Sequence, residues 1–277
     1  MRRFAVLGVL LVLSIPPSAG AYDTSAAGAS ECRVGTPADL AWTEALPDGG
    51  RLYHYALDGD TVVPSPPIGF DPLRASDSDL ERYGFPPRPA RAEERSGWTE
   101  DMATWQPSPH RGLCVTDRRF GSFVDGPDAL VSAVPPGIDV PWSGYVADES
   151  VDTYIAAQGD YNQKAFGATA CSPAEMGSWV GIGGYTTGSL IQVGTGMFKQ
   201  SGVAKYWAWY EYIRPANQNP AVEMPNVDVN PGDNIHLYTV HQRSTGITTF
   251  YVHNGTNGTN QSCNQDLGEQ LLRWHKR

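Results

Sequence analysis

Polar and aromatic side chains recur at strand spacing in three segments of this chain. The segments are Ser178–Gly184 (SWVGIGG), Leu190–Gly194 (LIQVG) and Tyr206–Tyr212 (YWAWYEY). A glutamine amide in such a set can donate a hydrogen bond to a developing oxyanion, and a carboxylate can accept and return a proton. Hydrolysis of a peptide bond requires both kinds of group. The three segments are therefore candidates for a substrate site.

The spacing divides each segment into two faces, because successive side chains on a strand point in opposite directions. One face is apolar and is expected to supply a core, from Val180, Ile182, Ile191 and Val193. The other face combines aromatic and polar side chains, namely Trp179, Gln192, Trp209 and Glu211. Small residues on this second face would let the backbone of a ligand approach, at Gly181, Gly183 and Gly194. We expect this face to be a concave binding surface.

The chain after residue 141 is typical of an all-β domain. Short stretches of strand-forming residues are separated by turn signals, and few helices are credible there. The expected strands include Pro141–Val146, Tyr154–Tyr161, Ile235–Val240 and Thr248–Val252, followed by an Asn-Gly turn at Asn254. Strands without intervening helices favour a jelly-roll-like sandwich of two antiparallel sheets over residues 141–277.

Residues 22–140 have a different composition. Two proline-rich stretches indicate extended chain, at Pro64–Pro67 and Pro86–Pro89. Two short helices are expected, at Ser76–Tyr83, capped by Ser76, and within Glu93–Trp105. We otherwise expect an irregular, Pro-rich segment with little regular structure. Two interpretations stay open, a propeptide or auxiliary region that packs on the sandwich and a partly disordered linker.

Residues 1–21 have the pattern of a secretory signal peptide. Arg2 and Arg3 precede the apolar run Phe4–Leu13, and Ala19-Gly20-Ala21 offers a small-residue cleavage site. The protein is therefore expected to be secreted. Removing these residues leaves 18 basic against 30 acidic side chains, so the formal charge changes from −10 to −12. Nucleic acid and anionic membranes are poor partners for such an acidic chain.

The chain has four cysteines, at positions 32, 114, 171 and 263. An even number in a secreted protein favours two disulfides, for which three connectivities exist. We predict the pairs Cys32–Cys114 and Cys171–Cys263, which would cross-link each region internally. No Cys-x-x-Cys spacing exists, and His236 and His241 would point to opposite faces of a strand. We therefore expect neither a metal nor a cofactor.

The order of the motifs resembles the glutamic peptidases, the eqolisin family, over roughly residues 141–262. The resemblance rests on Trp142-Ser-Gly-Tyr145, the three segments above, Pro231-Gly-Asp233 and the Asn-Gly-Thr hairpin. It implies a secreted endopeptidase that acts on polypeptides, works as a monomer and carries its active site on the concave face of a sandwich. It also implies that Gln192 is catalytic, and that substrate contacts come from Trp142, Trp179, Trp209 and Glu211.

The chain departs from that family after the hairpin. The family's catalytic glutamate lies on a later strand, in a stretch resembling Ala-Glu-(Trp/Phe)-Ile. The corresponding tail, Gln265–Arg277, does not match it. Glu269 has the wrong surroundings for that role, and Glu211 matches a cleft position that contacts or supports the substrate. The resemblance thus implies a Gln/Glu acid endopeptidase from whose sequence the catalytic glutamate is missing, so that this chain can be inactive.

Other protease classes fit less well. The sequence has no Asp-Thr-Gly pair, no His-Glu-x-x-His and no Gly-x-Ser-x-Gly motif. The alternative function is a non-catalytic β-sandwich module that binds carbohydrate or peptide on its aromatic face, for example by stacking sugars on Trp179, Trp207 and Trp209.

Overall fold

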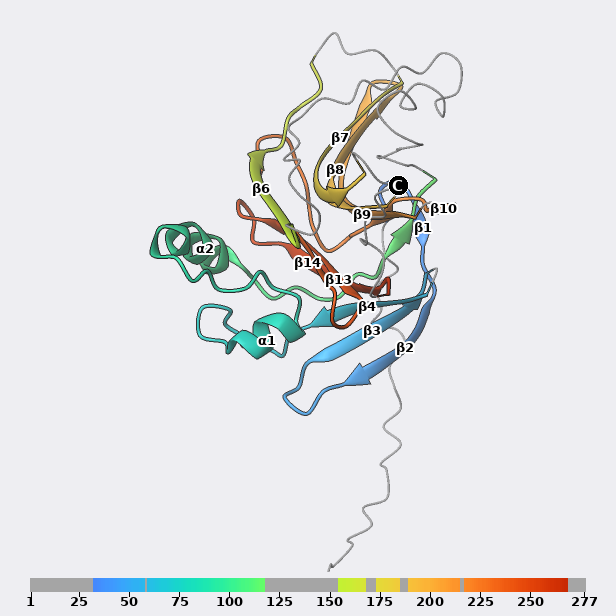
Figure 1. The fold of residues 1–277 in the computed structure, drawn as a ribbon. Coiled ribbons are helices and arrows are strands. Elements are labelled where there is room, and N and C mark those ends of the chain that lie inside the picture. The colour runs from blue at the N-terminus through green and yellow to red at the C-terminus, as the bar shows by residue number, and fades with distance from the viewer. Residues whose placement is uncertain are drawn as a thin grey trace, which may run out of the picture.

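The computed structural model describes residues 32–57, 59–117, 154–167, 173–184, 189–214 and 217–268. Its strands form two antiparallel sheets that pack into a sandwich (Figure 1). This confirms the predicted all-β sandwich. The described residues also contain helices α1 (Asp77–Arg82) and α2 (Ala92–Thr104). Among these residues, no helix is long and apolar enough to cross a membrane.

Sheet A carries the three segments singled out above. Its strand order is β1 (Thr36–Pro37), β5 (Cys114–Val115), β11 (Val222–Glu223), β9 (Val203–Arg214), β8 (Leu190–Gln200) and β7 (Ala174–Gly183). β10 (Asn217–Gln218) also pairs with β9. The strands β9, β8 and β7, at one end of this order, are the longest in the sheet, and they pair in an unbroken antiparallel register. Sheet A therefore holds these segments side by side.

Sheet B forms the other layer. Its order is β2 (Leu40–Ala45), β3 (Arg51–Ala56), β4 (Asp60–Ser65), β14 (Asn260–Asp266), β13 (Ile247–Asn254), β12 (Asn234–Gln242) and β6 (Ala156–Asn162). The expected strands at Tyr154–Tyr161, Ile235–Val240 and Thr248–Val252 correspond to β6, β12 and β13. The expected strand at Pro141–Val146 lies outside the described residues.

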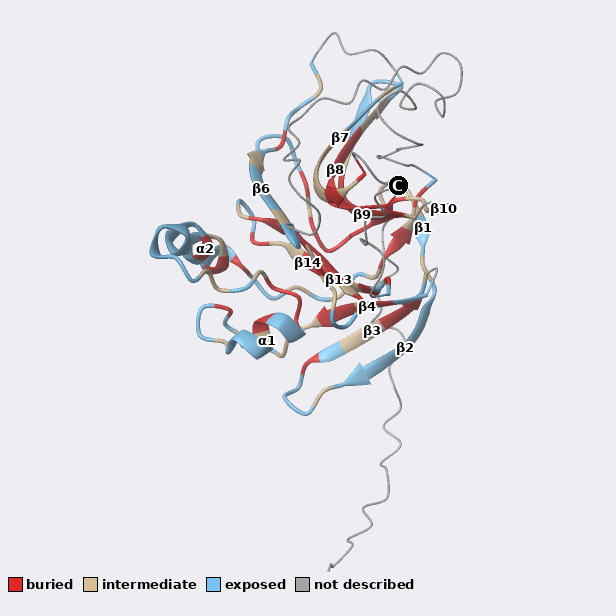
Figure 2. Cartoon of the chain, viewed as in Figure 1, coloured by how far each residue is buried: buried red, intermediate tan, exposed pale blue. Residues whose placement is uncertain are grey.

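The main core lies between the two sheets, where buried residues from both layers meet (Figure 2). Sheet A contributes Ile182, Ile191 and Val193, and Val180 packs against them partly buried. Sheet B contributes Leu237 and Phe250, among others, and the Phe250 ring stacks on Tyr210 at 4.6 Å between centroids. The four aliphatic residues expected to form a core thus lie in it.

The N-terminal segment is more regular than its composition indicated. Its strands β2, β3 and β4 extend sheet B beyond β14, and β1 and β5 extend sheet A beyond β11. Gly49, at φ +93°, and a hydrogen bond from Gly50 N–H to Asp48 Oδ1 form the turn between β2 and β3. Pro64 lies in β4 outside the part paired with β14, so its missing N–H removes no bond of that pairing.

Both helices pack on the outer face of sheet B. The Ser76 hydroxyl caps α1 by accepting a hydrogen bond from Asp79 N–H at 3.1 Å, as the sequence predicted. A second apolar cluster joins the helices and their flanking residues to the sheet, through Leu80, Tyr83, Phe85, Trp98, Met102, Trp105, Tyr238 and Tyr251. Residues 32–57 and 59–117 are therefore part of the packed structure, at the edges of both sheets and on one outer face.

The first predicted disulfide is present and the second is not. Cys32 and Cys114 are bonded at an S–S distance of 2.03 Å. Cys263 is a free thiol within the described part of the chain and lies fully buried in β14, where burial raises its pKa. The predicted Cys171–Cys263 bridge is thus corrected by the finding of a free thiol packed in the core, while Cys171 lies outside the described residues.

Candidate functional site

Gln192 and Glu211 lie opposite each other on neighbouring strands of sheet A. The register of β8 and β9 pairs the two residues directly, so their side chains lie on the same face. The Gln192 Nε2 group donates a hydrogen bond to Glu211 Oε2 at 2.5 Å. The residues are 19 positions apart in the chain, and the hairpin between β8 and β9 brings them together.

Two tryptophans lie one step along the same face. Gly194 on β8 is paired with Trp179 on β7 and with Trp209 on β9. Trp179 and Trp209 belong to a third apolar cluster, on the opposite side of the sheet from the main core. The register therefore places four predicted residues on the outer face of sheet A, namely Trp179, Gln192, Trp209 and Glu211. Their roles remain predictions.

Neighbouring side chains fill part of the space that the glycines leave. A Cβ atom built at Gly194 would lie 2.8 Å from Trp179 Cβ, and one at Gly181 would lie 3.1 Å from Gln192 Cβ. At Gly196 a Cβ would collide with the ring of Trp207. We expected the small residues to make room for a ligand. The nearest atoms, however, are backbone oxygens of the neighbouring strand for Gly194 (Ser178 O) and Gly181 (Ile191 O), so these glycines first allow close packing within the sheet itself.

The site is closed to solvent in this structure. Gln192, Trp209 and Glu211 are each 0% exposed, and Trp179 is partly exposed. Among the described residues, Gln192 Oε1 has no hydrogen-bond partner. A buried amide oxygen without a partner is unfavourable by about 1–3 kcal/mol. The expected open surface is therefore a covered face that contains an unsatisfied acceptor beside a buried carboxylate.

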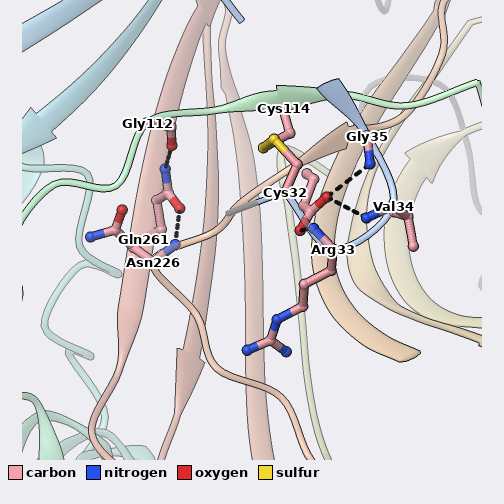
Figure 3. The surroundings of a disulfide bond; sticks show 9 residues. Cys32, Arg33, Val34, Gly35, Gly112, Cys114, Asn226 and Gln261 are labelled. Atoms are coloured by element: carbon pink, nitrogen blue, oxygen red, sulfur yellow. Dashed lines mark hydrogen bonds between the residues drawn. A yellow bond between two sulfur atoms is a disulfide. The ribbon is translucent and has the colours of Figure 1, made fainter. Parts of the chain in front are cut away.

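The N-terminal chain reaches this face beside Trp209. Glu223 pairs with Trp209 across β11 and β9, and its carboxylate accepts the N–H groups of Arg33, Val34 and Gly35 at 2.8, 3.2 and 3.3 Å. Figure 3 shows this strap, residues 33–35, next to the disulfide. The Val34 side chain packs on the Trp207 and Trp209 cluster. No local pattern in the sequence signals these contacts, because the partners are 188–190 residues apart.

An ion pair also holds the strap. The Arg33 guanidinium lies 2.7 Å from Asp228 Oδ1 and donates to Tyr206 O at 2.7 Å. Arg111, which lies near the second cysteine of the disulfide, also binds Asp228, at 2.8 Å. Backbone, charge and disulfide thus fix the strap at one end of the Gln192–Glu211 face.

The remaining predicted positions are not all visible. Trp142 and Glu269 lie outside the described residues. Around Gln192 and Glu211, the described part of the chain offers no group of three or more His, Cys, Asp or Glu side chains close enough to share a metal ion. The chemistry that the described residues supply there is that of an amide donor, a carboxylate and aromatic walls.

Comparison with known protein families agrees with these features. The sequence profile of the Peptidase A4 family matches residues 140–273, the range that contains β6 to β14. No curated protein and no solved structure matches the chain significantly. The strands β1 to β5 and both helices lie before the matched range. Residues 140–273 therefore form a domain of the Peptidase A4 family of glutamic peptidases.

Proposed function

We propose that the domain binds polypeptide on the outer face of sheet A and acts on it as a glutamic-type endopeptidase. The observation that carries this proposal is the buried hydrogen bond between Gln192 and Glu211 beside Trp179 and Trp209. Membership of a peptidase family supports polypeptide as the substrate class. The Cys32–Cys114 disulfide supports a secreted protein, because disulfides persist in oxidising compartments.

In this proposal Gln192 is the donor to the oxyanion. A primary amide carries two N–H hydrogens, and one of them is directed to Glu211. The Glu211 carboxylate thereby fixes the plane of the amide, and the second hydrogen can bind the oxygen on which negative charge develops. Since the pair is fully buried, the low local dielectric strengthens such a bond. Glu211 is therefore a positioning residue, and Trp179, Trp209 and Trp142 are the proposed substrate contacts.

Activation of water is the step for which we assign no residue with the family's pattern. The sequence contains no match to the stretch that carries the catalytic glutamate. General base catalysis contributes about 10²–10⁴-fold to a rate. We therefore propose that the chain binds polypeptide but hydrolyses it slowly. If turnover is fast, Glu211 is the carboxylate already within hydrogen-bond distance of Gln192 and becomes the base.

Access to the face is part of the proposal. Because Gln192 and Glu211 are 0% exposed, a substrate reaches them only after the covering chain has moved. Among the described residues, the strap, residues 33–35, is the chain segment that packs on the tryptophan cluster beside the site. The carbohydrate-binding alternative would need the same movement, because Trp207 and Trp209 are fully buried, and the peptidase family match favours polypeptide.

The test measures binding and turnover of an unfolded polypeptide, casein, by the purified chain at pH 3–4. We expect binding with slow turnover, and a further loss of about 10²–10³-fold in Gln192→Ala, as for removal of one oxyanion donor. Gln200→Ala is the matched control, since Gln200 lies exposed at the end of the same strand. Fast turnover that Glu211→Gln abolishes would make Glu211 the base. The absence of both binding and turnover would overturn the proposal.

A further inference from the structure

Three side chains from distant parts of the chain meet on the outer face of sheet B. Asp101 comes from α2, Asp160 from β6 and His236 from β12. The His236 Nδ1 atom lies 3.1 Å from Asp101 Oδ1 and 2.6 Å from Asp160 Oδ1. The side chain of Asp160 is well exposed, whereas those of His236 and Asp101 are largely buried. This cluster is the polar part of the contact between α2 and the sheet.

The other titratable groups that face the cluster do not balance its charge. Glu100 on α2 adds a second acidic group next to Asp101. On β13, the His253 ring stacks on His236 at 5.5 Å between ring centroids. Burial, and to a smaller extent the neighbouring His236, lowers the pKa of His253 to about 3. Burial also raises the pKa of Tyr251. Both β13 side chains are therefore uncharged from pH 4 to pH 8, so His236 alone can offset the acidic groups.

One imidazole nitrogen cannot satisfy two ionised carboxylates. Nδ1 carries at most one hydrogen, and both aspartates approach that atom. When both are ionised, two like charges are close together in a partly buried contact. When Asp101 is protonated, its carboxylic acid is neutral, and the repulsion between the two aspartates is removed. The geometry is thus better suited to acid than to neutral pH.

The pKa of Asp101 is shifted in the direction that this geometry requires, upward. Burial, with the neighbouring carboxylates of Asp160 and Glu100, raises the pKa of Asp101 to about 6, against the opposing effect of His236. A carboxyl group whose pKa is raised by folding stabilises the folded state below its unfolded pKa, near 3.8, and this contribution is lost as the pH rises through about 6. Docking of α2 is therefore strongest in acid.

We propose that Asp101, His236 and Asp160 form a pH-sensitive clasp that holds α2 on sheet B in acid and loosens it at neutral pH. The loosening is local, because apolar contacts of Trp98 and Met102 with the sheet do not titrate. The end of the helix is also tethered, since Gln106 N–H donates to Gly258 O at 3.1 Å. The clasp thus regulates one outer face of the sandwich without unfolding the domain, whether or not the chain hydrolyses peptides.

Hydrogen exchange of the full chain tests the clasp. Protection factors of the α2 amides, corrected for the intrinsic pH dependence of exchange, are compared at pH 4 and pH 7.5 with those of β8. We expect α2 protection to fall about tenfold at pH 7.5, with β8 unchanged. This is less than a two-unit pKa shift would allow, because the cluster is partly open to solvent. Asp101→Asn mimics the neutral acid and should keep the pH 4 protection at both pH values. Glu100→Gln is the control on the same helix and should leave most of the pH dependence in place.

Two further variants test the arrangement of charges. Asp160→Asn removes the like charge and should shift the midpoint of loosening to lower pH, whereas His236→Asn removes the opposite charge and should shift it to higher pH. Equal pH dependence in wild type and Asp101→Asn would overturn the proposal. Loss of α2 protection on adding EDTA, with recovery on adding Zn²⁺, would overturn it too, because a bound cation would then hold the three side chains together.

Discussion

The outer faces of the two sheets bury polar groups in different ways. On sheet A, Gln192 donates to Glu211 in a fully buried pair, and the donor is an amide that does not titrate. On sheet B, an imidazole stands between two carboxylates in a partly exposed contact. The amide donor on sheet A does not change charge with pH, whereas all three members of the cluster on sheet B are ionisable. The first arrangement suits a fixed site and the second suits a contact that responds to pH.

The two faces share one feature, which is that the N-terminal segment contacts both. The strap binds Glu223 on sheet A, and α1 and α2 pack on sheet B. This segment lies outside the range matched by the family profile. Two interpretations were open for this segment, a region that packs on the sandwich and a partly disordered linker, and its contacts with both sheets favour the packing region. We propose that the segment is retained in the functional protein. The predictions below change the two faces separately.

The largest effect is expected from the disulfide. Replacing Cys32 and Cys114 with alanine frees a loop of 82 residues, which costs on the order of 4 kcal/mol in the chain-entropy model. Urea unfolding should show this loss, and hydrogen exchange should show increased exchange of the strap on sheet A. If α2 on sheet B loosens as much as the strap does, the two faces are not independent.

A smaller effect is expected from Glu223. Its carboxylate accepts three backbone N–H groups of the strap, so Glu223→Ala should lower the free energy of unfolding by about 2–3 kcal/mol. Glu94→Ala is the control, because Glu94 is exposed on α2 and makes only a surface ion pair with Arg91. Equal stability of the two variants in urea unfolding would show that the strap is not held by this carboxylate.

The Gln192–Glu211 pair is tested by a double-mutant cycle. Each single alanine variant removes the same hydrogen bond between two buried side chains, so their costs should not add, and the coupling energy should be about 1–2 kcal/mol. The cycle is measured by urea unfolding at pH 4 and pH 7. A coupling energy near zero at both pH values would contradict the buried hydrogen bond on which the proposed function depends.

The smallest effect concerns α2 itself. Gly97 lies inside the helix, and a Cβ atom there would meet nothing within 4 Å. Gly97→Ala should therefore stabilise the helix by about 0.5–1 kcal/mol. Hydrogen exchange should show the same gain in α2 protection at pH 4 and pH 7.5. A gain at only one pH would mean that helix propensity and the clasp are coupled.

Much of the site could be predicted because strand alternation is a local property. The face shared by Gln192 and Glu211 follows from a period of two residues once β8 and β9 are assigned and paired, and the same rule places Ile191 and Val193 in the core. The Ser76 cap is likewise local, since donor and acceptor are three residues apart. The resemblance of motif order identified the family, which the profile match over residues 140–273 confirms.

The burial of the site could not be predicted in the same way. Strand parity tells which side chains share a face, but it does not tell what covers that face. Gln192 and Trp209 were expected on an open surface and are 0% exposed. The glycines are a related case, because the atoms that come close to Gly194 and Gly196 belong to Ser178, Trp179 and Trp207 on neighbouring strands.

The sequence by itself determined the local elements and their faces: the alternation of β7, β8 and β9, the capped helix α1 and the motif order of the family. Tertiary structure alone decided that β4 pairs with β14, that Cys263 remains a free thiol in the core, and that the strap binds Glu223. It also decided that Asp101, Asp160 and His236 meet. The physical reason is that these contacts join residues far apart in the chain, so no periodic pattern records them, and only the packing of the sandwich brings the partners within bonding distance.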